Sequence, residues 1–292
     1  MADRTWRDAL LIARFELRES LRTRRALALA ILFLLVALGL ALAYSAAVNE
    51  TRKVVGQQPL LRGAAGTAYE QLLLWLAGGD RKVARYMADQ PPAALFLVKL
   101  GTWFVPLLVV LTSAEGIARD ISTRAARYTL LRTSRLAFAL GKVLGQGLLV
   151  AVVLGLSAVL FLGVALSRTP DFDLIGSAFS IVRFAPFIVG HALCFVALAA
   201  LASLLASSPA GARGLALLFL LCAGLLLAVP AWVHLLGLPR VFGLVAQFSP
   251  FAHDGLAWQP GLLARSAGVL VYLSFAAAFF SLGYLRLRSR DV

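Results

Sequence analysis

The sequence contains few charged residues and few sulfur-containing residues. Only 14% of its 292 residues are Asp, Glu, Lys or Arg, whereas soluble domains contain about a quarter. Hydrophobic residues make up 61%, and the mean hydropathy is +0.86. This composition excludes an ordinary soluble enzyme. The two cysteines, Cys194 and Cys222, lie inside apolar runs and do not form a disulfide framework.

Residue patterns for nucleotide, metal and nucleic-acid binding are also missing. A phosphate-binding loop ends in Gly-Lys-Ser/Thr, but Gly141-Lys142 is followed by Val143, and Leu136 stands where the first glycine should be. The three histidines are far apart, and no His or Cys pair has ligand spacing. The arginines flank apolar runs instead of forming one groove, which argues against nucleic acid as a partner.

Long apolar runs dominate what is present. A helix needs roughly 20 apolar residues to cross a bilayer, and in lipid its backbone groups must pair within the segment. The runs that meet this length are 26–48, 93–114, 143–166, 184–207, 214–234 and 262–285. The sequence therefore predicts an all-α membrane protein with six transmembrane helices, kinked where Pro106, Pro186 or Pro230 interrupts a run.

The basic residues predict how the chain is oriented. If the N terminus is cytoplasmic, 17 of the 28 basic residues lie on that side, and six of the others fall in the long segment 49–92, where the charge rule is weak. Both termini are therefore expected in the cytoplasm. The abundance of Ala, Leu and Arg suggests a bacterial source, so we expect the plasma (inner) membrane.

Three segments outside the predicted spans are long enough to have a role of their own. Residues 1–25 contain an apolar stripe at helical spacing and predict an amphipathic helix at the cytoplasmic interface; the stripe consists of Trp6, Leu10, Ala13, Leu17 and Leu21. Residues 49–92 form an outer loop that could bind an extracytoplasmic partner. Residues 115–142 form a cytoplasmic loop rich in arginine, which reads either as a solvated loop or as a contact for another protein.

A few polar residues in or near the spans are candidate functional groups. Lys99 and Arg183 lie near the outer face and, with His191, could mark a substrate path, although long basic side chains there can also extend to the headgroups. Ser157 and His191 loosely resemble the catalytic pair of rhomboid-type intramembrane proteases. Ser157 is surrounded by Gly and Leu, as a helix-packing residue often is.

Three motifs, in this order, resemble those of the ABC-2 type permeases, the membrane subunits of ABC exporters. IARFELRESLRTRR (12–25), followed by a span, is similar to the family's interfacial elbow helix. The loop 115–142 is similar to its coupling helix, with an acid at the start and Ser-Arg and Gly-Lys at the end. FSPFAHDGLAWQPG (248–261) is similar to a Ser-Pro-Phe segment before the last span. Two positions depart from the pattern: Arg124-Ala125-Ala126 replaces Gly-Thr, and Arg132 replaces a proline.

The resemblance implies a mechanism and a set of partners. Such a permease works with a second copy of itself or a homologous permease and with two copies of a separate ABC ATPase, which binds ATP and Mg²⁺; no cofactor is bound by the permease chain. The residues implied for ATPase contact are Glu115, Arg119, Asp120, Arg124, Arg127, Tyr128, Arg132 and Arg135. Those implied for an outer gate or partner contact are Ser249, Pro250, Phe251 and His253.

The sequence thus leads to one function with two alternatives. We expect a non-catalytic permease subunit that couples ATP hydrolysis by its partner to export of a hydrophobic or amphipathic substrate, because the spans contain few polar side chains. One alternative is a mechanical transmitter that drives an extracytoplasmic partner through residues 49–92 while no cargo crosses. The other is the intramembrane serine protease.

Overall fold

The computed structural model describes residues 2–57, 70–235, 240–259 and 261–289. Six of the helices in these ranges are long and apolar enough to cross a membrane, which confirms the predicted all-α membrane fold. The helices that contain these spans are α2 (Arg24–Gln57), α5 (Pro92–Ser113), α8 (Arg135–Arg168), α9 (Leu174–Leu205), α10 (Pro209–Leu226) and α12 (Leu262–Ser289). The shorter elements are α1 (Ala2–Arg22), α4 (Arg81–Ala88), α6 (Gly116–Ser122), α7 (Ala125–Leu130), α11 (Val229–Leu235) and the 3-10 helices η1 (Arg240–Phe248) and η2 (Pro250–Trp258).

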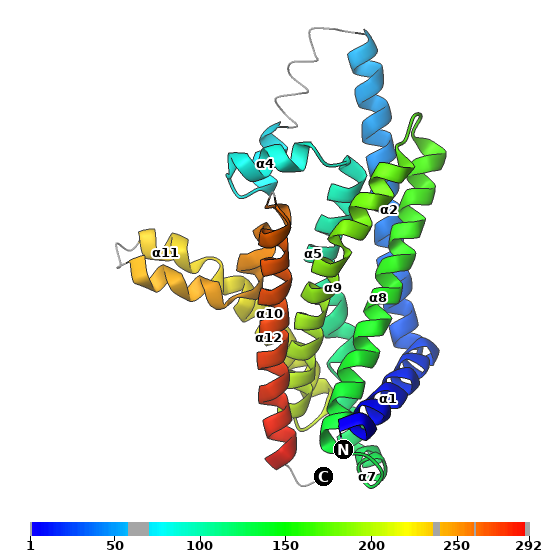
Figure 1. Ribbon diagram of the computed structural model, residues 1–292, viewed down its shortest axis with the longest axis vertical. Helices are drawn as coiled ribbons and strands as arrows, with labels where there is room; N and C mark the ends of the chain where they lie inside the picture. Colours follow the sequence, from blue (N-terminus) through cyan, green and yellow to red (C-terminus); the bar gives the residue numbers. More distant parts are fainter. Residues whose placement is uncertain (1, 58–69, 236–239, 260, 290–292) are drawn as a thin grey trace.

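Helix α9 is the centre of the bundle. It packs against α5, α8, α10 and α12, and Figure 1 shows it between them. Its contact with α12 relies on small residues: a Cβ atom at Gly268 would lie 2.9 Å from the Phe187 ring, and one at Gly283 would lie 3.0 Å from Leu204. Small residues let membrane helices approach closely, and dispersion forces at such contacts replace the hydrophobic effect that lipid cannot supply.

Different elements lie at the two ends of the bundle. Both termini, α1 and α7 lie at the lower end of Figure 1, and α4 lies at the upper end. Asp80, just before α4, caps the helix: its side chain accepts from the backbone N–H of Lys82 at 2.8 Å. Its buried Val83 and Met87 join an apolar cluster with Trp258. We refer below to the end with the termini as the terminal end and to the end with α4 as the α4 end.

The fifth crossing is shorter than the sequence predicts. The apolar run continues to 234, but α10 ends at Leu226 and the chain turns into the short helix α11. Pro230 is the cause, because proline disfavours helical backbone in the residue before it and is tolerated only in the first turn of a helix. Pro230 is accordingly the second residue of α11 and not a kink within a longer span. Helices α11 and η1 extend sideways from the bundle in Figure 1.

Other boundaries depend on side-chain caps. Ser134 accepts from the N–H of Ala137 at 3.1 Å, so α8 begins before residue 143, within the predicted loop 115–142. Pro106 and Pro186 lie inside α5 and α9, as predicted. In the predicted outer loop, α2 continues to Gln57, and residues 58–69 lie outside the described residues.

Candidate coupling site

Helix α1 lies against the base of α8 with almost no space between the two backbones. Ala9 and Ala13 of α1 are buried there. A Cβ atom at Gly141 of α8 would lie 2.8 Å from the carbonyl oxygen of Ala9, and one at Gly145 would lie 2.9 Å from that of Ala13. Only glycine permits so close an approach. The backbone of the N-terminal helix is therefore fixed directly to the third span.

The face that α1 buries against α8 shares only Ala13 with the apolar stripe predicted for the membrane interface. Trp6, Leu10 and Leu21 of that stripe are about half exposed, whereas the small and polar residues Glu16 and Ser20 are buried with the alanines. The large residues of the stripe are thus left accessible, while Ala13 packs against α8. This placement suits an interfacial helix, whose large apolar side chains contact lipid while its small ones contact protein.

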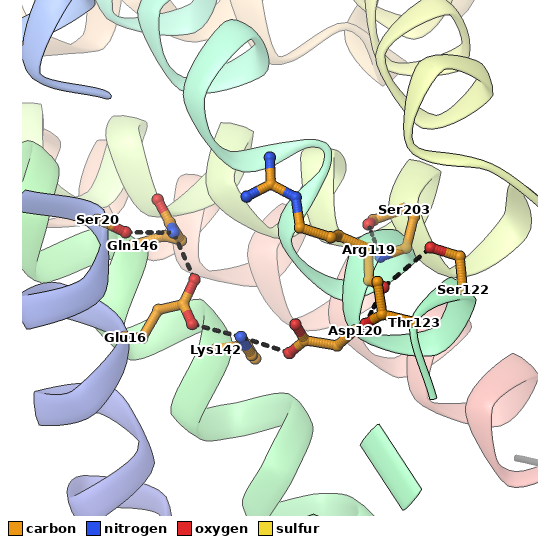
Figure 2. A network of polar contacts seen from close by, with 10 residues as sticks. Glu16, Ser20, Arg119, Asp120, Ser122, Thr123, Lys142, Gln146 and Ser203 are labelled. Atoms are coloured by element: carbon orange, nitrogen blue, oxygen red, sulfur yellow. Dashed lines mark hydrogen bonds and ion pairs between the residues drawn. The ribbon is translucent and has the colours of Figure 1, made fainter. Parts of the chain in front are cut away.

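One lysine joins three segments of this end (Figure 2). Lys142 of α8, only 8% exposed, forms an ion pair with Glu16 of α1 and another with Asp120 of α6, the latter at 2.6 Å. Gln146, one turn further along α8, donates to Glu16 Oε1 at 2.8 Å and to Ser20 Oγ at 3.1 Å. A buried charge is costly unless it is paired and hydrogen-bonded. We call these residues, Glu16, Ser20, Asp120, Lys142 and Gln146, the Lys142 network.

Helix α6 is tied to the far side of the bundle as well. Glu115, at its start, accepts from Arg119 Nη2 at 3.0 Å and forms an ion pair with Arg213 of α10. The backbone N–H of Ala118 donates to Ser203 Oγ of α9 at 2.8 Å, in a buried position. Movement of α6 would therefore be passed to α9 and α10 on one side and through Asp120 to α8 and α1 on the other.

Helix α7 presents an exposed surface next to this anchored segment. It is preceded by Arg124, whose φ of 62° makes the sharp turn between α6 and α7. Arg127 and Arg132 are exposed, and the side chains of Tyr128 and Leu131 are 75% and 82% exposed. A combination of arginine, tyrosine and leucine on one accessible surface is typical of a protein contact.

A comparison with known protein families places the chain in one of them. The model of the family described as ABC-2 family transporter protein matches residues 10–292. This chain is an ABC-2 family transporter protein. No curated protein sequence matches the transporter. Membership identifies it as a multi-pass membrane permease of ABC transporters, which associates with an ABC ATPase subunit.

The structure divides the eight residues predicted for ATPase contact into two groups. In the first group, Arg119 pairs with Glu115 at the start of α6, and Glu115, Asp120 and Arg135 hold the transporter's own helices together. Arg135 does so by donating to the carbonyl oxygens of Leu287 and Arg288 at the end of α12, at 3.1 and 2.5 Å. The second group is exposed around α7: Arg124, Arg127, Tyr128 and Arg132.

Sequence reasoning missed several residues of the site. Glu16, Ser203 and Arg213 were not singled out, although they join α1, α9 and α10 to residues 115–142, and neither was Gln146, which joins α8 to α1. Glu16 gave one usable signal, since it lies at helical spacing from Ala9, Ala13 and Ser20. Nothing in the sequence links Ser203 or Arg213 to residues near 115.

A second polar cluster lies inside the bundle toward the α4 end. Tyr272 of α12 donates to Asp254 Oδ1 of η2 at 2.5 Å, and His191 Nε2 of α9 lies 3.5 Å from the same oxygen. Lys99 of α5 lies above the ring of Trp258, 5.8 Å from its centre. Burial raises the pKa of Asp254 to about 6, although its hydrogen bond from Tyr272 and the charge of Lys99 act in the opposite direction.

This cluster contains two of the three residues predicted for a substrate path. Lys99 and His191 both lie near Asp254, whereas Arg183 is exposed and takes no part. Ser157 donates to the carbonyl oxygen of Val153 in its own helix at 2.7 Å, and no hydrogen bond joins it to His191 in the described part of the chain. The structure does not place the two as a catalytic pair.

The Ser-Pro-Phe segment enters the bundle instead of forming a loop at its end. Ser249 is fully buried and donates to the carbonyl oxygen of Ala223 at 2.7 Å, and Pro250 is buried beside it. The Phe251 ring packs 5.1 Å from that of Phe195, in the second half of α9. His253 Nε2 lies 3.0 Å from the Gln247 carbonyl oxygen. Among the described residues, no group of His, Cys, Asp and Glu could hold a metal ion.

Proposed function

We propose that this transporter is the export permease of an ABC system and that α6 and α7 transmit movement from a separate ATPase. The ATPase, in two copies, would bind ATP and Mg²⁺, and two permease chains would form the membrane part. The chain itself would catalyse no reaction. The observation that carries the proposal is the position of Lys142, a buried cation that joins the N-terminal helix to α6.

The steps of transmission follow from the contacts. The exposed surface around α7 would dock on the ATPase, where its arginines could form charge-assisted hydrogen bonds with carboxylates. Closure of the ATPases would then displace α6. Because α6 is bonded to α8 through Asp120 and to α9 through Ala118, the displacement would reach the spans that line the centre of the bundle.

The orientation and the cargo are part of this proposal. The terminal end would be cytoplasmic, in a bacterial inner membrane, which is supported by the surplus of arginine at that end and by the presence of both termini there. The cargo would be hydrophobic or amphipathic. This is supported by the largely apolar composition of the six spans.

Charge reversal at α7 tests the docking step. The triple variant R124E/R127E/R132E should lose co-purification with the cognate ABC ATPase while its amount in the membrane is unchanged. The matched control is R81E/K82E/R85E, which reverses three exposed positive charges at the α4 end and should retain the ATPase. If the α7 variant retained the ATPase as well as wild type does, the docking assignment would be wrong.

A further inference from the structure

A cavity of about 350 Å³ opens beside the Lys142 network, bounded by α1, α2, α5, α6 and α8. Its lining includes polar residues, among them Ser20, Thr23 and Arg24, and the apolar residues Leu29 and Leu111. Figure 2 shows three of the lining residues, with Ser20 and Gln146 to the left of Arg119. The volume is that of a small-molecule site.

Most charges that line this cavity are already paired. Lys142 is held by Glu16 and Asp120, and Glu115 is held by Arg119 and Arg213. Two other charged residues of the lining are not paired in this way. Glu19 of α1 and Arg24 of α2 are exposed, and neither has an ion pair or a side-chain hydrogen bond within the part of the chain that the structure describes. The cavity thus offers one anion and one cation that are not already paired.

The hydrogen-bonding groups suit a phosphate and an amine. Arg119 donates to Glu115 through Nη2 alone, so its other N–H groups are available to a phosphate oxygen, as are those of Arg24. The carboxylate of Glu19 can accept from an ammonium group. The hydroxyl oxygens of Ser20 and Thr23 can do the same, because each has lone pairs to spare.

The position of the cavity points to a lipid. It lies where α2 and α5 reach the terminal end of the bundle, next to an amphipathic helix with exposed Trp6 and Leu10. Leu29 and Leu111, both half-buried, continue the wall toward the apolar parts of their spans. A ligand with a phosphate, an amine and apolar chains would contact every part of this wall.

We propose that this cavity binds the headgroup of a zwitterionic phospholipid, with its phosphate on Arg24 and Arg119 and its ammonium group on Glu19. The lipid is a resident part of the joint between α1 and α6. It is distinct from the cargo, and the assignment does not depend on the proposed coupling to an ATPase.

The test compares lipid binding by two neighbouring arginine variants. The full chain is purified in mild detergent, micelles are doped with phosphatidylethanolamine or phosphatidylglycerol, and bound lipid is counted by native mass spectrometry. R24Q should lower phosphatidylethanolamine affinity about tenfold, the effect of losing a charge-assisted hydrogen bond. R22Q is the matched control, since Arg22 is exposed two residues away but does not line the cavity, and it should bind as wild type does.

A second variant tests the amine contact and a soluble competitor tests the source of the phosphate. E19Q should reduce the preference for phosphatidylethanolamine over phosphatidylglycerol without abolishing phospholipid binding. Inorganic phosphate and glycerophosphoethanolamine should compete weakly, because they lack the apolar chains. Equal binding by R24Q and R22Q, no preference between the lipids in wild type, or full displacement by either soluble phosphate would each overturn the proposal.

Discussion

Tyr272 donates its hydroxyl hydrogen to Asp254 Oδ1 across 2.5 Å and so joins the last span to the re-entrant segment η2. The tyrosine is fully buried. Y272F leaves the carboxylate without this donor, and we expect the free energy of unfolding to fall by about 1–3 kcal/mol. Thermal unfolding in detergent measures the loss. Y284F is the control, because the hydroxyl of Tyr284 has no hydrogen bond among the described residues; equal losses would mean that the Tyr272 bond contributes nothing.

The raised pKa of Asp254 predicts a pH dependence of stability. Burial raises this pKa to about 6 in the folded protein, above the value of about 4 expected in the unfolded chain. The folded state then binds the proton more tightly, so this contribution to stability is complete below about pH 4 and is lost as the pH rises through about 6. The melting temperature of wild type should therefore fall more between pH 5 and pH 7 than that of D254N. Parallel curves for the two proteins would contradict the prediction.

The contact of α1 with α8 predicts opposite effects for alanine at two kinds of glycine. G141A or G145A would push a methyl group into the backbone of α1 and should destabilise the protein by about 1–3 kcal/mol. G155A, on the same helix but with nothing within 4 Å, should be neutral or stabilise by up to about 1 kcal/mol. Chemical or thermal unfolding distinguishes the two classes. A loss at Gly155 as large as at Gly141 would show that general helix effects, and not the α1 contact, are responsible.

Removal of Lys142 should be far more damaging than removal of an exposed charge. K142M leaves the carboxylates of Glu16 and Asp120 without their shared cation, and loss of one partner of a buried pair costs about 3–5 kcal/mol. The triple variant K142M/E16Q/D120N removes the stranded charges and should recover most of the loss. R18M, on the exposed face of α1, serves as control. If the triple variant were no more stable than K142M, charge burial would not be the cause.

The helical bundle was predictable because a backbone that crosses lipid must form its hydrogen bonds within the protein. Apolar runs of sufficient length must be helices in a bilayer, and six such helices are present. Helix ends were less predictable, since they depend on a cap such as Ser134 or on a proline such as Pro230, whose effects compete with the apolar pattern. Composition identifies a span, but local hydrogen bonds decide where it ends.

Of the candidate coupling site, the sequence could predict only the stretch of chain that contains it. Order along the chain pointed to residues 115–142, and the exposed surface around α7 lies there. The partners of that segment come from distant positions, such as Glu16 and Ser203, and a single sequence holds no signal that pairs them. The face of α1 that packs against α8 was not predictable either, because it consists of small residues and an ion pair and not of large apolar side chains.

Lys142 has one positive charge and two acidic neighbours, and this unequal count has a mechanical consequence. If Asp120 moves away with α6, the ammonium group stays neutralised by Glu16, and the reverse holds if α1 moves. Neither displacement strands the lysine in the protein interior. A movement of α6 or α1 that stretches one of the two ion pairs therefore leaves Lys142 bound to the other helix, so α8 stays connected at this end while the pairs adjust.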